Sequence, residues 1–244
     1  MAELEPIARE AGRLALDARS RLDCRRKPDG SIVTNGDVLV EEFLRPKLQS
    51  LIPGSEVWGE ELGRSEEGPG GLWLIDPIDG TTNFAAGSPL WGVSLALIRQ
   101  GRLLMGAIYL PELDEMCLGC EGGGVTLNGI TLLPIPPGSI DPQDPVSVGD
   151  WLIRDQADHR LPGKIRCSGA FVIDGVFTAT QRYRGMIGYR ERLYDAAASI
   201  LFGQELGADV RYADGEPLNL RALSQGGSFE RPWLIFPAES AFRL

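Results

Sequence analysis

The sequence lacks several residue types and patterns that catalytic and membrane proteins use. It contains a single histidine, His159, which excludes histidine triads and zinc sites built from several histidines. His159 stands among charged residues, so a solvated loop is expected for it. No apolar run approaches the roughly 20 residues that span a bilayer, and the first residues lack the basic and apolar regions of a signal peptide. We therefore expect a cytoplasmic protein with no membrane partner.

Positive charge is also scarce. Lys and Arg number 24 against 34 Asp and Glu, which gives a formal net charge of -10. Nonspecific binding to nucleic acid or anionic lipid needs a surplus of positive charge. The composition therefore predicts no nucleic-acid partner, whereas an acidic surplus is compatible with cation binding.

The four cysteines are too few and too scattered for a disulfide framework, and a cytosolic chain keeps them reduced. Cys117 and Cys120 form a Cys-x-x-Cys pair. A second pair for zinc is missing, and the neighbouring residues are typical of a strand and a turn, not of the helix start in a redox motif. We expect ordinary packing for both thiols.

Apolar periodicity predicts two helices near the start of the chain. The residues of the first stripe recur at steps of three and four, as on an amphipathic helix: Leu4, Ile7, Ala11, Leu14, Ala15, Ala18 and Leu22. Turn-forming residues at 27–31 end that pattern. A second apolar stripe follows Asp37 and stops at Pro53-Gly54. Asp37 is thus expected near the start of the second helix.

Short apolar runs predict strands in the rest of the first half. Residues 72–75 precede Asp76-Pro77 and are expected to form a buried strand that ends in a loop. The runs 91–98 and 103–110 are separated by turn-forming residues and predict a hairpin, and 115–120 adds another strand. The first half is therefore expected to combine helices with a largely antiparallel sheet.

Five prolines between Leu133 and Pro145 predict an extended connection rather than regular structure. We interpret it as the boundary between an N-terminal α+β half, residues 1–135, and a smaller C-terminal α/β half, residues 146–244. Helices and strands are predicted to alternate in the second half. They are a helix at 169–179, a strand at 183–189, a helix at 194–206 and strands at 208–212 and 233–236.

The segment Asp76-Pro77-Ile78-Asp79-Gly80-Thr81-Thr82 carries the strongest chemical signal. Its two carboxylates are separated by a rigid turn, which can aim both at one place and leave the Ile78 carbonyl unpaired. Mg2+ takes carboxylate, carbonyl and water oxygens, and two close carboxylates need a cation if both are to stay ionised. The glycine and threonines supply N–H groups and hydroxyls that can hold a phosphate. Two successive turns between strands remain the alternative, because Asp-Pro and Asp-Gly are usual turn dipeptides.

Two further acidic residues favour the chemical interpretation. Glu60 lies in a loop-like stretch, Gly59-Glu60-Glu61, shortly before the predicted strand. Asp195 opens the long helix of the second half, where capping or interaction with the helix dipole is the alternative role. With no histidine or cysteine in this set, we expect direct attack by water rather than a phospho-enzyme.

These residues resemble the signature of the inositol monophosphatase family of lithium-sensitive, metal-dependent sugar phosphatases. The family's strand followed by Asp-Pro-Ile-Asp-Gly-Thr-Thr-Asn-Phe stands here at 73–84. The resemblance spans nearly the whole chain through further motifs: Val33-Thr34-x-x-Asp37, Gly59-Glu60-Glu61, Gly87-x-Pro89, Gly106-x-Ile108-x-x-Pro111, Asn128-Gly129, Tyr194-Asp195-Ala196-Ala197-Ala198 and Asp214 to Pro217. It implies a layered α+β or α/β sandwich (αβαβα) of the sugar phosphatase type, a homodimer and lithium sensitivity.

The same resemblance implies two or three Mg2+ ions per site. Glu60, Asp76 and the Ile78 carbonyl resemble the ligands of one ion. Asp76, Asp79 and Asp195 resemble the ligands of a second, so that Asp76 would bridge the two. Two ions a few ångströms apart can generate a nucleophile from bound water and stabilise the leaving oxygen.

The family also implies roles for the remaining residues of the segment. Thr81, hydrogen-bonded to Asp37, resembles the residue that orients and deprotonates the attacking water, and Glu60 is expected to assist. The amides of Gly80, Thr81 and Thr82, together with Asp79, are expected to hold the phosphate. Lys27, in Lys-x-Asp-Gly-Ser, resembles a mobile loop that closes over the site, with an exposed turn as the alternative.

The chain departs from the family near the second helix of the site. Tyr194 stands where the family usually has Trp, and its ring can still cover the metal. Gly188 stands where inositol-hydrolysing members place an acidic residue, which puts inositol specificity in question. Arg190 and Arg192 are candidates for binding a second phosphate or a carboxylate of the substrate, with a solvated strand face as the alternative.

The leading interpretation is a Mg2+-dependent hydrolase that releases phosphate from a small sugar, polyol or inositol phosphate. Fructose 1,6-bisphosphate and 3'-phosphoadenosine nucleotides are alternative substrates, the nucleotide less favoured because Thr82 stands where its phosphatases tend to carry Lys. A non-catalytic member that binds metal or phosphate as a regulator is an alternative from another class. A calcium module would need a denser ligand loop.

Overall fold

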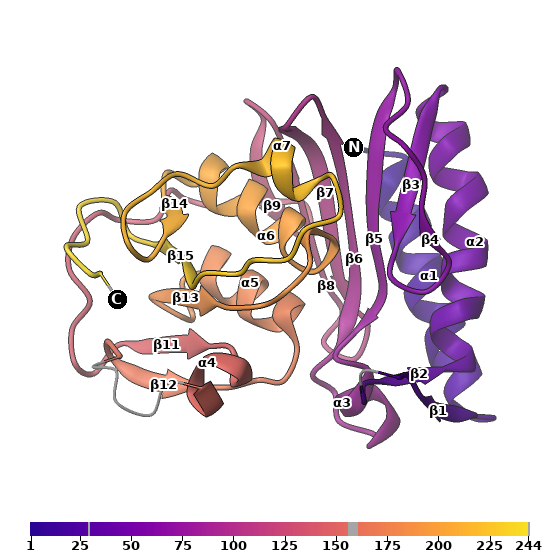
Figure 1. The fold of residues 1–244 in the computed structure, drawn as a ribbon, viewed down its shortest axis with the longest axis horizontal. Coiled ribbons are helices and arrows are strands. Elements are labelled where there is room, and N and C mark those ends of the chain that lie inside the picture. The colour runs from indigo at the N-terminus through magenta and orange to yellow at the C-terminus, as the bar shows by residue number, and fades with distance from the viewer. Residues whose placement is uncertain (29, 156–160, 244) are drawn as a thin grey trace.

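Helices and sheets alternate in layers across the computed structural model, which describes residues 1–28, 30–155 and 161–243. Figure 1 shows the layers in order: helices α1 (Leu4–Arg19) and α2 (Asn35–Leu51), an eight-stranded sheet, helices α5 (Phe171–Ala179) and α6 (Leu193–Glu205), and a five-stranded sheet. Helix α4 (Asp150–Asp155) packs on the second sheet, where Leu152 joins a cluster with Val146 and Ile187. The predicted αβαβα sandwich is confirmed. His159, for which a solvated loop was expected, lies outside the described residues.

Helix α1 forms through an apolar face, and α2 combines an apolar face with a capped start. The apolar face of α1 is fully buried at Leu4, Ala8, Ala11 and Ala15. Helix α2 begins with a capping box, in which Thr34 Oγ1 accepts hydrogen bonds from Gly36 and Asp37 N–H, and Asp37 Oδ2 accepts one from Thr34 N–H. Asp37 therefore lies in the first turn of α2, as the sequence predicted.

The eight-stranded sheet is largely antiparallel, as predicted. Its strands are β3 (Ser55–Gly59), β4 (Gly63–Arg64), β5 (Gly71–Asp79), β6 (Gly92–Arg99), β7 (Arg102–Leu110), β8 (Glu115–Cys120), β9 (Gly124–Leu127) and β10 (Ile130–Thr131). Their order is β10-β9-β8-β7-β6-β5-β3-β4, and within this sheet the described residues form one parallel pair, β3 with β5. The predicted hairpin is β6 with β7, and the strand predicted at 115–120 is β8.

Strand β5 continues through the segment that was expected to be a loop or a pair of turns. Asp76 pairs with Ser94 of β6, and Asp79 pairs with Gly92. Between these two pairs, β5 therefore contains one residue more than β6. This is a β-bulge, in which one residue stays outside the ladder. Pro77 lies inside the bulge, where its missing N–H removes no regular ladder bond. The prediction of a loop here is therefore wrong, and both carboxylates stand on the end of a buried strand.

The five-stranded sheet combines parallel and antiparallel pairs. Its strands are β11 (Pro145–Val148), β12 (Lys164–Arg166), β13 (Gly185–Gly188), β14 (Asp209–Tyr212) and β15 (Trp233–Phe236), in the order β12-β11-β13-β15-β14. Strands β11, β12 and β13 are parallel, and β15 is antiparallel to both of its neighbours. The helices and strands predicted for this half all occur, with ends shifted by at most two residues. Residues 132–144 form no helix or strand, as predicted, and the division of the chain into two halves at this connection stays a prediction.

Several short elements were not predicted, because they are too short to show a periodic pattern. The hairpin of β1 (Cys24–Arg26) and β2 (Ile32–Thr34) flanks the turn at 27–31, and α3 (Thr81–Ala85) and α7 (Leu220–Leu223) are single turns. Cys117 is fully buried on β8, and all four cysteines are free thiols, in agreement with ordinary packing. None of the described helices is both long and apolar enough to pass through a membrane.

Candidate functional site

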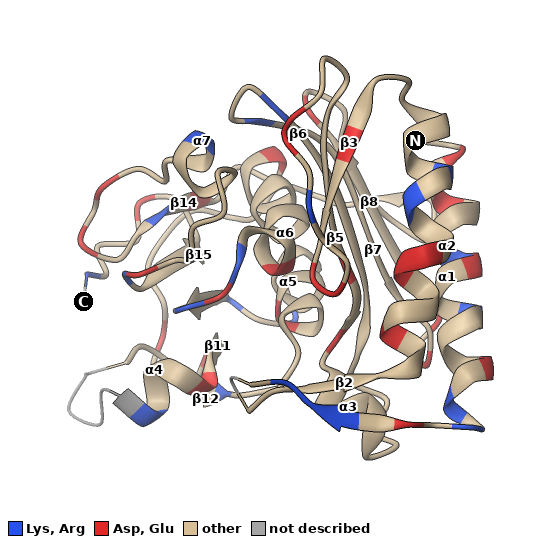
Figure 2. Ribbon diagram, turned by 45° about the vertical axis from the view of Figure 1, so that its right-hand side comes forward, with Lys and Arg blue, Asp and Glu red and all other residues tan. Residues whose placement is uncertain are grey.

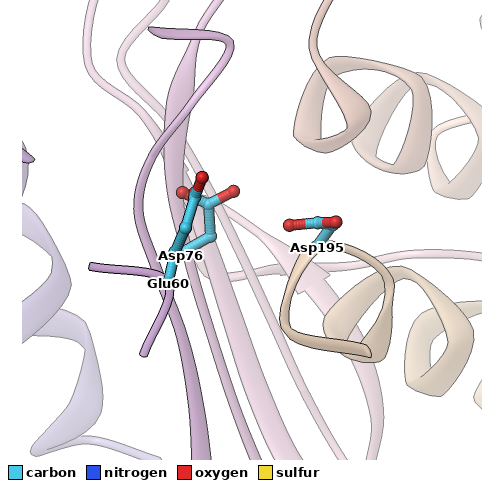
Figure 3. Close-up of side chains that lie close together, drawn as sticks. All are labelled: Glu60, Asp76 and Asp195. Atoms are coloured by element: carbon cyan, nitrogen blue, oxygen red, sulfur yellow. The ribbon is translucent and has the colours of Figure 1, made fainter. Parts of the chain in front are cut away.

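Three carboxylates from distant parts of the chain converge between the eight-stranded sheet and α6. Glu60, Asp76 and Asp195 each place an oxygen within 4.8 Å of the others. Figure 3 shows Glu60 and Asp76 side by side, with Asp195 pointing toward them from the first turn of α6. The sequence predicted all three as metal ligands, and the fold brings them together.

Local structure explains how each of these carboxylates is placed. Glu60 follows the end of β3, and because β3 and β5 are parallel, its N–H donates to Ile75 O at 3.2 Å, next to Asp76. Asp195 is in the first turn of α6, where its Oδ2 accepts a hydrogen bond from Arg192 N–H at 2.7 Å. The predicted capping role of Asp195 is therefore real, and its second oxygen is left for another ligand.

The electrostatics of Asp76 indicate that this site needs a cation. Asp76 is 2% exposed. Burial raises its pKa well above the ordinary value, and the charges of Glu60, Asp79 and Asp195 raise it further. Burial and the charges of Glu60 and Asp79 also raise the pKa of Asp195 well above normal. Carboxylates this close stay ionised together only if positive charge compensates them, and an all-oxygen donor set suits Mg2+.

Asp79 is oriented differently from the other acidic residues. Its Oδ2 accepts a hydrogen bond of 2.5 Å from Val172 N–H, at the start of α5, and it is not one of the three carboxylates within 4.8 Å. Burial raises the pKa of Asp79 to about 7, although the bond from Val172 lowers it. The two aspartates of the segment were expected to point at one place, whereas here Asp79 is turned to the helix start. Its role as a ligand stays a prediction.

The Ile78 carbonyl is not unpaired, contrary to expectation. It accepts a hydrogen bond from Thr81 Oγ1 at 2.9 Å, because the bulge turns the chain back into α3. A carbonyl oxygen has two lone pairs, so one remains for a further partner.

Thr81 and Asp37 form the pair that the family resemblance implies. Thr81 Oγ1 lies 3.2 Å from Asp37 Oδ1. Asp37 Oδ2 accepts hydrogen bonds from Thr34 N–H at 2.8 Å and from Thr34 Oγ1 at 2.5 Å. Burial raises the pKa of Asp37, although the bonds from Thr34 lower it. Asp37 is therefore a rigidly held acceptor whose affinity for a proton is increased.

The Gly80-Thr81-Thr82 stretch forms the start of the short helix α3. Gly80 precedes it with φ of 82°, a left-handed conformation, and a Cβ atom there would lie 2.7 Å from Ala170 Cβ. Both facts require glycine. The first amides of a helix have no partner within it, so this turn presents N–H groups toward the same end of β5.

Lys27 extends from the β1–β2 hairpin into the site. Its Nζ lies 2.8 Å from Glu60 Oε1 and 2.5 Å from Glu61 Oε1. Burial lowers the pKa of Lys27, but the two carboxylates raise it above normal overall. Figure 2 shows the basic segment of this hairpin beside α3. The exposed-turn alternative is therefore wrong for Lys27, whose ammonium is a positive charge supplied by the chain itself.

The two candidate arginines are engaged at the rim. The Arg190 guanidinium carbon lies over the rings of Tyr189 and Trp151, 5.0 Å and 5.5 Å from their centres. Arg192 Nη1 donates to Gly226 O at 2.9 Å. Both side chains are exposed, as the solvated alternative expected, although the two residues follow β13 (Gly185–Gly188) and do not lie in it. Their contact with a substrate stays a prediction.

Sequence reasoning did not identify three residues that shape the site. Glu41 and Arg45 of α2 contact the turn that follows Glu60. Trp233 of β15 lies against Gly188, where a Cβ atom would be 2.5 Å from Trp233 Nε1. For the pair on α2 a signal was available, because Asp37, Glu41 and Arg45 are spaced by four on one helix face. No local signal places Trp233 beside Gly188.

Residues 2–233 match the model of the family described as the inositol monophosphatase family. Among curated proteins, the histidinol-phosphatase of Chlorobaculum parvum is 38% identical over 50% of this chain and 48% of its own length. The inositol-1-monophosphatase of Mesorhizobium japonicum is 32% identical over 78% of this chain and 75% of its own length. The chain thus spans about half of the first relative and three quarters of the second.

Solved structures share the same fold. An IMPase of Thermotoga maritima superposes with a TM-score of 0.80 and 26% identity, covering 96% of this chain and 91% of that one. An IMPase/NADP phosphatase solved with Mg2+ and phosphate gives a TM-score of 0.78 at 20% identity, covering 95% and 87%. At 20% identity, the similarity to the IMPase/NADP phosphatase shows a shared fold and nothing more.

Proposed function

Because the chain belongs to the inositol monophosphatase family and is a phosphatase, we propose that it hydrolyses a small phosphomonoester with Mg2+ at the carboxylate cluster. The observation that carries the proposal is the convergence of Glu60, Asp76 and Asp195 within 4.8 Å. The IMPase/NADP phosphatase that shares the fold was solved with Mg2+ and phosphate, which supports the same ion here.

We assign the metal ligands from this cluster and its neighbours. The carboxylates of Glu60, Asp76, Asp79 and Asp195 and the carbonyl of Ile78 would supply the oxygens, and Asp76 would be shared if two ions bind. When bound, Mg2+ supplies Lewis acidity that lowers the pKa of a water and neutralises charge on the phosphate. Asp79 Oδ2 accepts the hydrogen bond from Val172 N–H, so Asp79 would take part through its second oxygen.

Thr81 and Asp37 hold and move the proton. If Thr81 donates its hydroxyl proton to Asp37 Oδ1, its oxygen lone pairs are left to accept a hydrogen bond from the attacking water. The water proton then passes to Thr81 as the Thr81 proton passes to Asp37. The raised pKa of Asp37 favours this direction, since a better proton acceptor makes a better general base near neutral pH.

The amides of Gly80, Thr81 and Thr82 would hold the phosphate oxygens. They stand at the start of α3 on the end of β5, directly beyond Asp79. Backbone N–H groups in such a turn form an anion-binding concavity. The phosphate would therefore bind between this turn and the carboxylate cluster, with its phosphorus facing the Thr81 hydroxyl.

The surroundings of Gly188 bear on which alcohol the phosphate ester contains. Gly188 packs so closely against Trp233 that no acidic side chain fits there, which speaks against recognition of inositol in the usual way. Sugar, polyol and fructose bisphosphate esters remain candidates. The Chlorobaculum relative favours a second candidate, the phosphate ester of an amino alcohol such as histidinol phosphate.

Phosphate release from a panel of phosphomonoesters, with Mg2+ and with EDTA, tests the proposal. The panel contains inositol 1-phosphate, fructose 1,6-bisphosphate, a 3'-phosphoadenosine nucleotide, NADP and histidinol phosphate. We expect Mg2+-dependent release from at least one ester and the weakest response to inositol 1-phosphate. Release in EDTA equal to that in Mg2+ would contradict the metal assignment, and release from no ester would favour a regulatory, non-catalytic role.

A turnover in ¹⁸O-labelled water tests attack at phosphorus. The label is expected in phosphate and not in the alcohol, because the water is proposed to attack phosphorus while the P–O bond to the leaving alcohol breaks. Label in the alcohol would contradict this attack. We further propose that the protein is a homodimer inhibited by lithium, as the family resemblance implies, and that it acts in the cytoplasm. Light scattering and inhibition assays check the first two.

A further inference from the structure

A buried carboxylate of α2 lies directly behind the turn that carries Glu60. Glu41 is fully buried. Its Oε2 accepts a hydrogen bond from Glu61 N–H at 2.8 Å, and its Oε1 accepts one from Leu62 N–H at 3.1 Å. Both donors follow Glu60 immediately in the chain. The turn therefore obtains its backbone hydrogen bonds from a side chain on a neighbouring helix.

Arg45, one helical turn further along α2, locks Glu41 in place. Its Nε and Nη2 donate to Glu41 Oε1 at 2.9 Å and 2.7 Å, and Nη2 also donates to Gly63 O at 2.5 Å. The Glu41–Arg45 pair thus makes three hydrogen bonds to the backbone of the turn, two with its N–H groups and one with a carbonyl. Charge-assisted bonds of this kind are short and directional, so they fix orientation as well as position.

Gly59 is required by Glu41. A Cβ atom at position 59 would lie 1.9 Å from Glu41 Oε1, a distance that no arrangement of real side chains permits. The end of β3 can therefore approach α2 only with glycine at this position. The glycine of the Gly59-Glu60-Glu61 motif is explained by this contact rather than by contact with a metal.

One face of helix α2 carries Asp37, which contacts Thr81, and Glu41, which contacts the turn beyond Glu60. Asp37, Glu41 and Arg45 are spaced by four residues and therefore lie one above the other. One rigid element thus sets the distance between the residues assigned to the water and one of the residues assigned to the metal.

We propose that Glu41, locked by Arg45, is a positioning residue that holds the Glu60 carboxylate in the orientation that binds Mg2+. The proposal rests on the proposed function for the identity of the ion. Glu41 itself does not touch the metal or the substrate. Residues that orient metal ligands typically contribute 10- to 100-fold to metal affinity or activity.

Glu41→Gln separates positioning from a general structural role. The amide keeps the size of the side chain, but its NH2 group faces a backbone N–H, and Arg45 loses its ionic partner. Calorimetric titration of Mg2+ into the metal-free, full-length protein should give a dissociation constant raised about 10- to 100-fold. At saturating Mg2+, kcat should stay within roughly threefold of the wild type, because the ligand itself is intact.

Glu42→Gln is the matched control, since Glu42 is the exposed neighbour on the same helix. It should bind Mg2+ with the wild-type affinity. A Glu41→Gln protein that binds Mg2+ as tightly as the wild type and this control would overturn the proposal. So would a kcat at saturating Mg2+ reduced in proportion to affinity, because that pattern indicates a distorted fold.

Arg45→Lys keeps the inference testable if Glu41→Gln does not fold, as judged by its melting curve. Lysine retains the charge but cannot bond to Glu41 and Gly63 with the same fork. The Mg2+ dissociation constant should again rise with little loss of kcat, and an unchanged constant would refute the inference. Because calorimetry needs no turnover, absence of phosphatase activity would refute the proposed function without affecting this readout.

Discussion

Thr81 Oγ1 lies 3.2 Å from Asp37 Oδ1, although the two residues are 44 positions apart in the chain. Thr81 is the first residue of α3, and Asp37 lies in the first turn of α2, so each is held by its own local structure. The same hydroxyl lies 2.9 Å from Ile78 O, so its single proton can be donated to only one of them. Proton transfer to Asp37 requires that the Thr81 hydroxyl donates to Asp37 Oδ1 and not to Ile78 O.

Thr81→Val should therefore lower kcat by about 100- to 10,000-fold, the range of general acid–base catalysis, with little change in KM. Valine has the shape of threonine without the hydroxyl. Thr81→Ser is the control and should retain activity within about tenfold, because it keeps the hydroxyl. Equal kcat values for the Val and Ser proteins in a steady-state assay would show that the hydroxyl has no part in the reaction.

Asp76→Asn should have opposite effects on activity and on the stability of the metal-free protein. Loss of the proposed bridging charge should reduce kcat/KM by roughly 1,000-fold, about 4 kcal/mol. The same change removes a buried charge next to Glu60, Asp79 and Asp195, so in EDTA at pH 8 the variant should melt at a higher temperature than the wild type.

Added Mg2+ gives a second readout for the same variant. The ion binds the folded state, so it should raise the melting temperature of the wild type and change that of Asp76→Asn far less. Lower stability of the variant in EDTA, or an equal response of both proteins to Mg2+, would speak against a repulsive cluster that binds metal.

Gly188→Ala should destabilise the protein by about 1–3 kcal/mol, the usual effect of overpacking. The added methyl group would lie 2.5 Å from Trp233 Nε1 and 2.8 Å from Glu191 Oε2. Gly227→Ala is a suitable control, because the atoms nearest to a Cβ there are 3.9 Å away. Urea unfolding measures both. A Gly188→Ala protein as stable as the control would mean that Trp233 can move, and an acidic residue at 188 would again be conceivable.

Asp174 should make stability depend on pH. Burial raises the pKa of Asp174 to about 7, and its Oδ1 has no hydrogen-bond partner among the described residues. In the unfolded chain the pKa is about 3.9. Because the folded pKa is higher, the stabilising contribution is complete below pH ~4 and is lost as the pH rises through about 7.

Asp174→Asn cannot ionise and should escape this loss. The free energy of unfolding of the variant minus that of the wild type should increase by roughly 2–3 kcal/mol between pH 5 and pH 8. The other acidic residues titrate in both proteins, so they largely cancel in the difference. Urea unfolding at the two pH values measures it. A difference that does not change with pH would show that Asp174 is not protonated in the folded protein.

Most of the secondary structure could be predicted because it depends on local patterns. The stripes of α1 and α2 and the apolar run of β15 each bury one face or the whole of a short segment, and their neighbours in sequence are enough to indicate that. The capping box at Thr34 and Asp37 is likewise local. Short strands such as β3 and β11 carry too few residues to show a period, and they form because partner strands are available in the fold.

The site was predicted in composition but not in geometry. Glu60, Asp76, Asp195, Asp37 and Thr81 were all named from motifs. The bulge in β5 was missed because Asp-Pro and Asp-Gly are typical turn dipeptides, and pairing with Ser94 and Gly92 outweighs that preference.

By itself, the sequence predicted which residues carry the chemistry, because the segment from Asp76 to Thr82 and its partner motifs resemble those of the family. Tertiary structure alone decided how they are arranged. Asp79 turns to Val172, and Lys27 reaches Glu60, because each meets a partner that lies far away in the chain. Glu41 supports Glu60 for the same reason. These contacts arise from the packing of whole helices and strands, and local sequence patterns do not predict that packing.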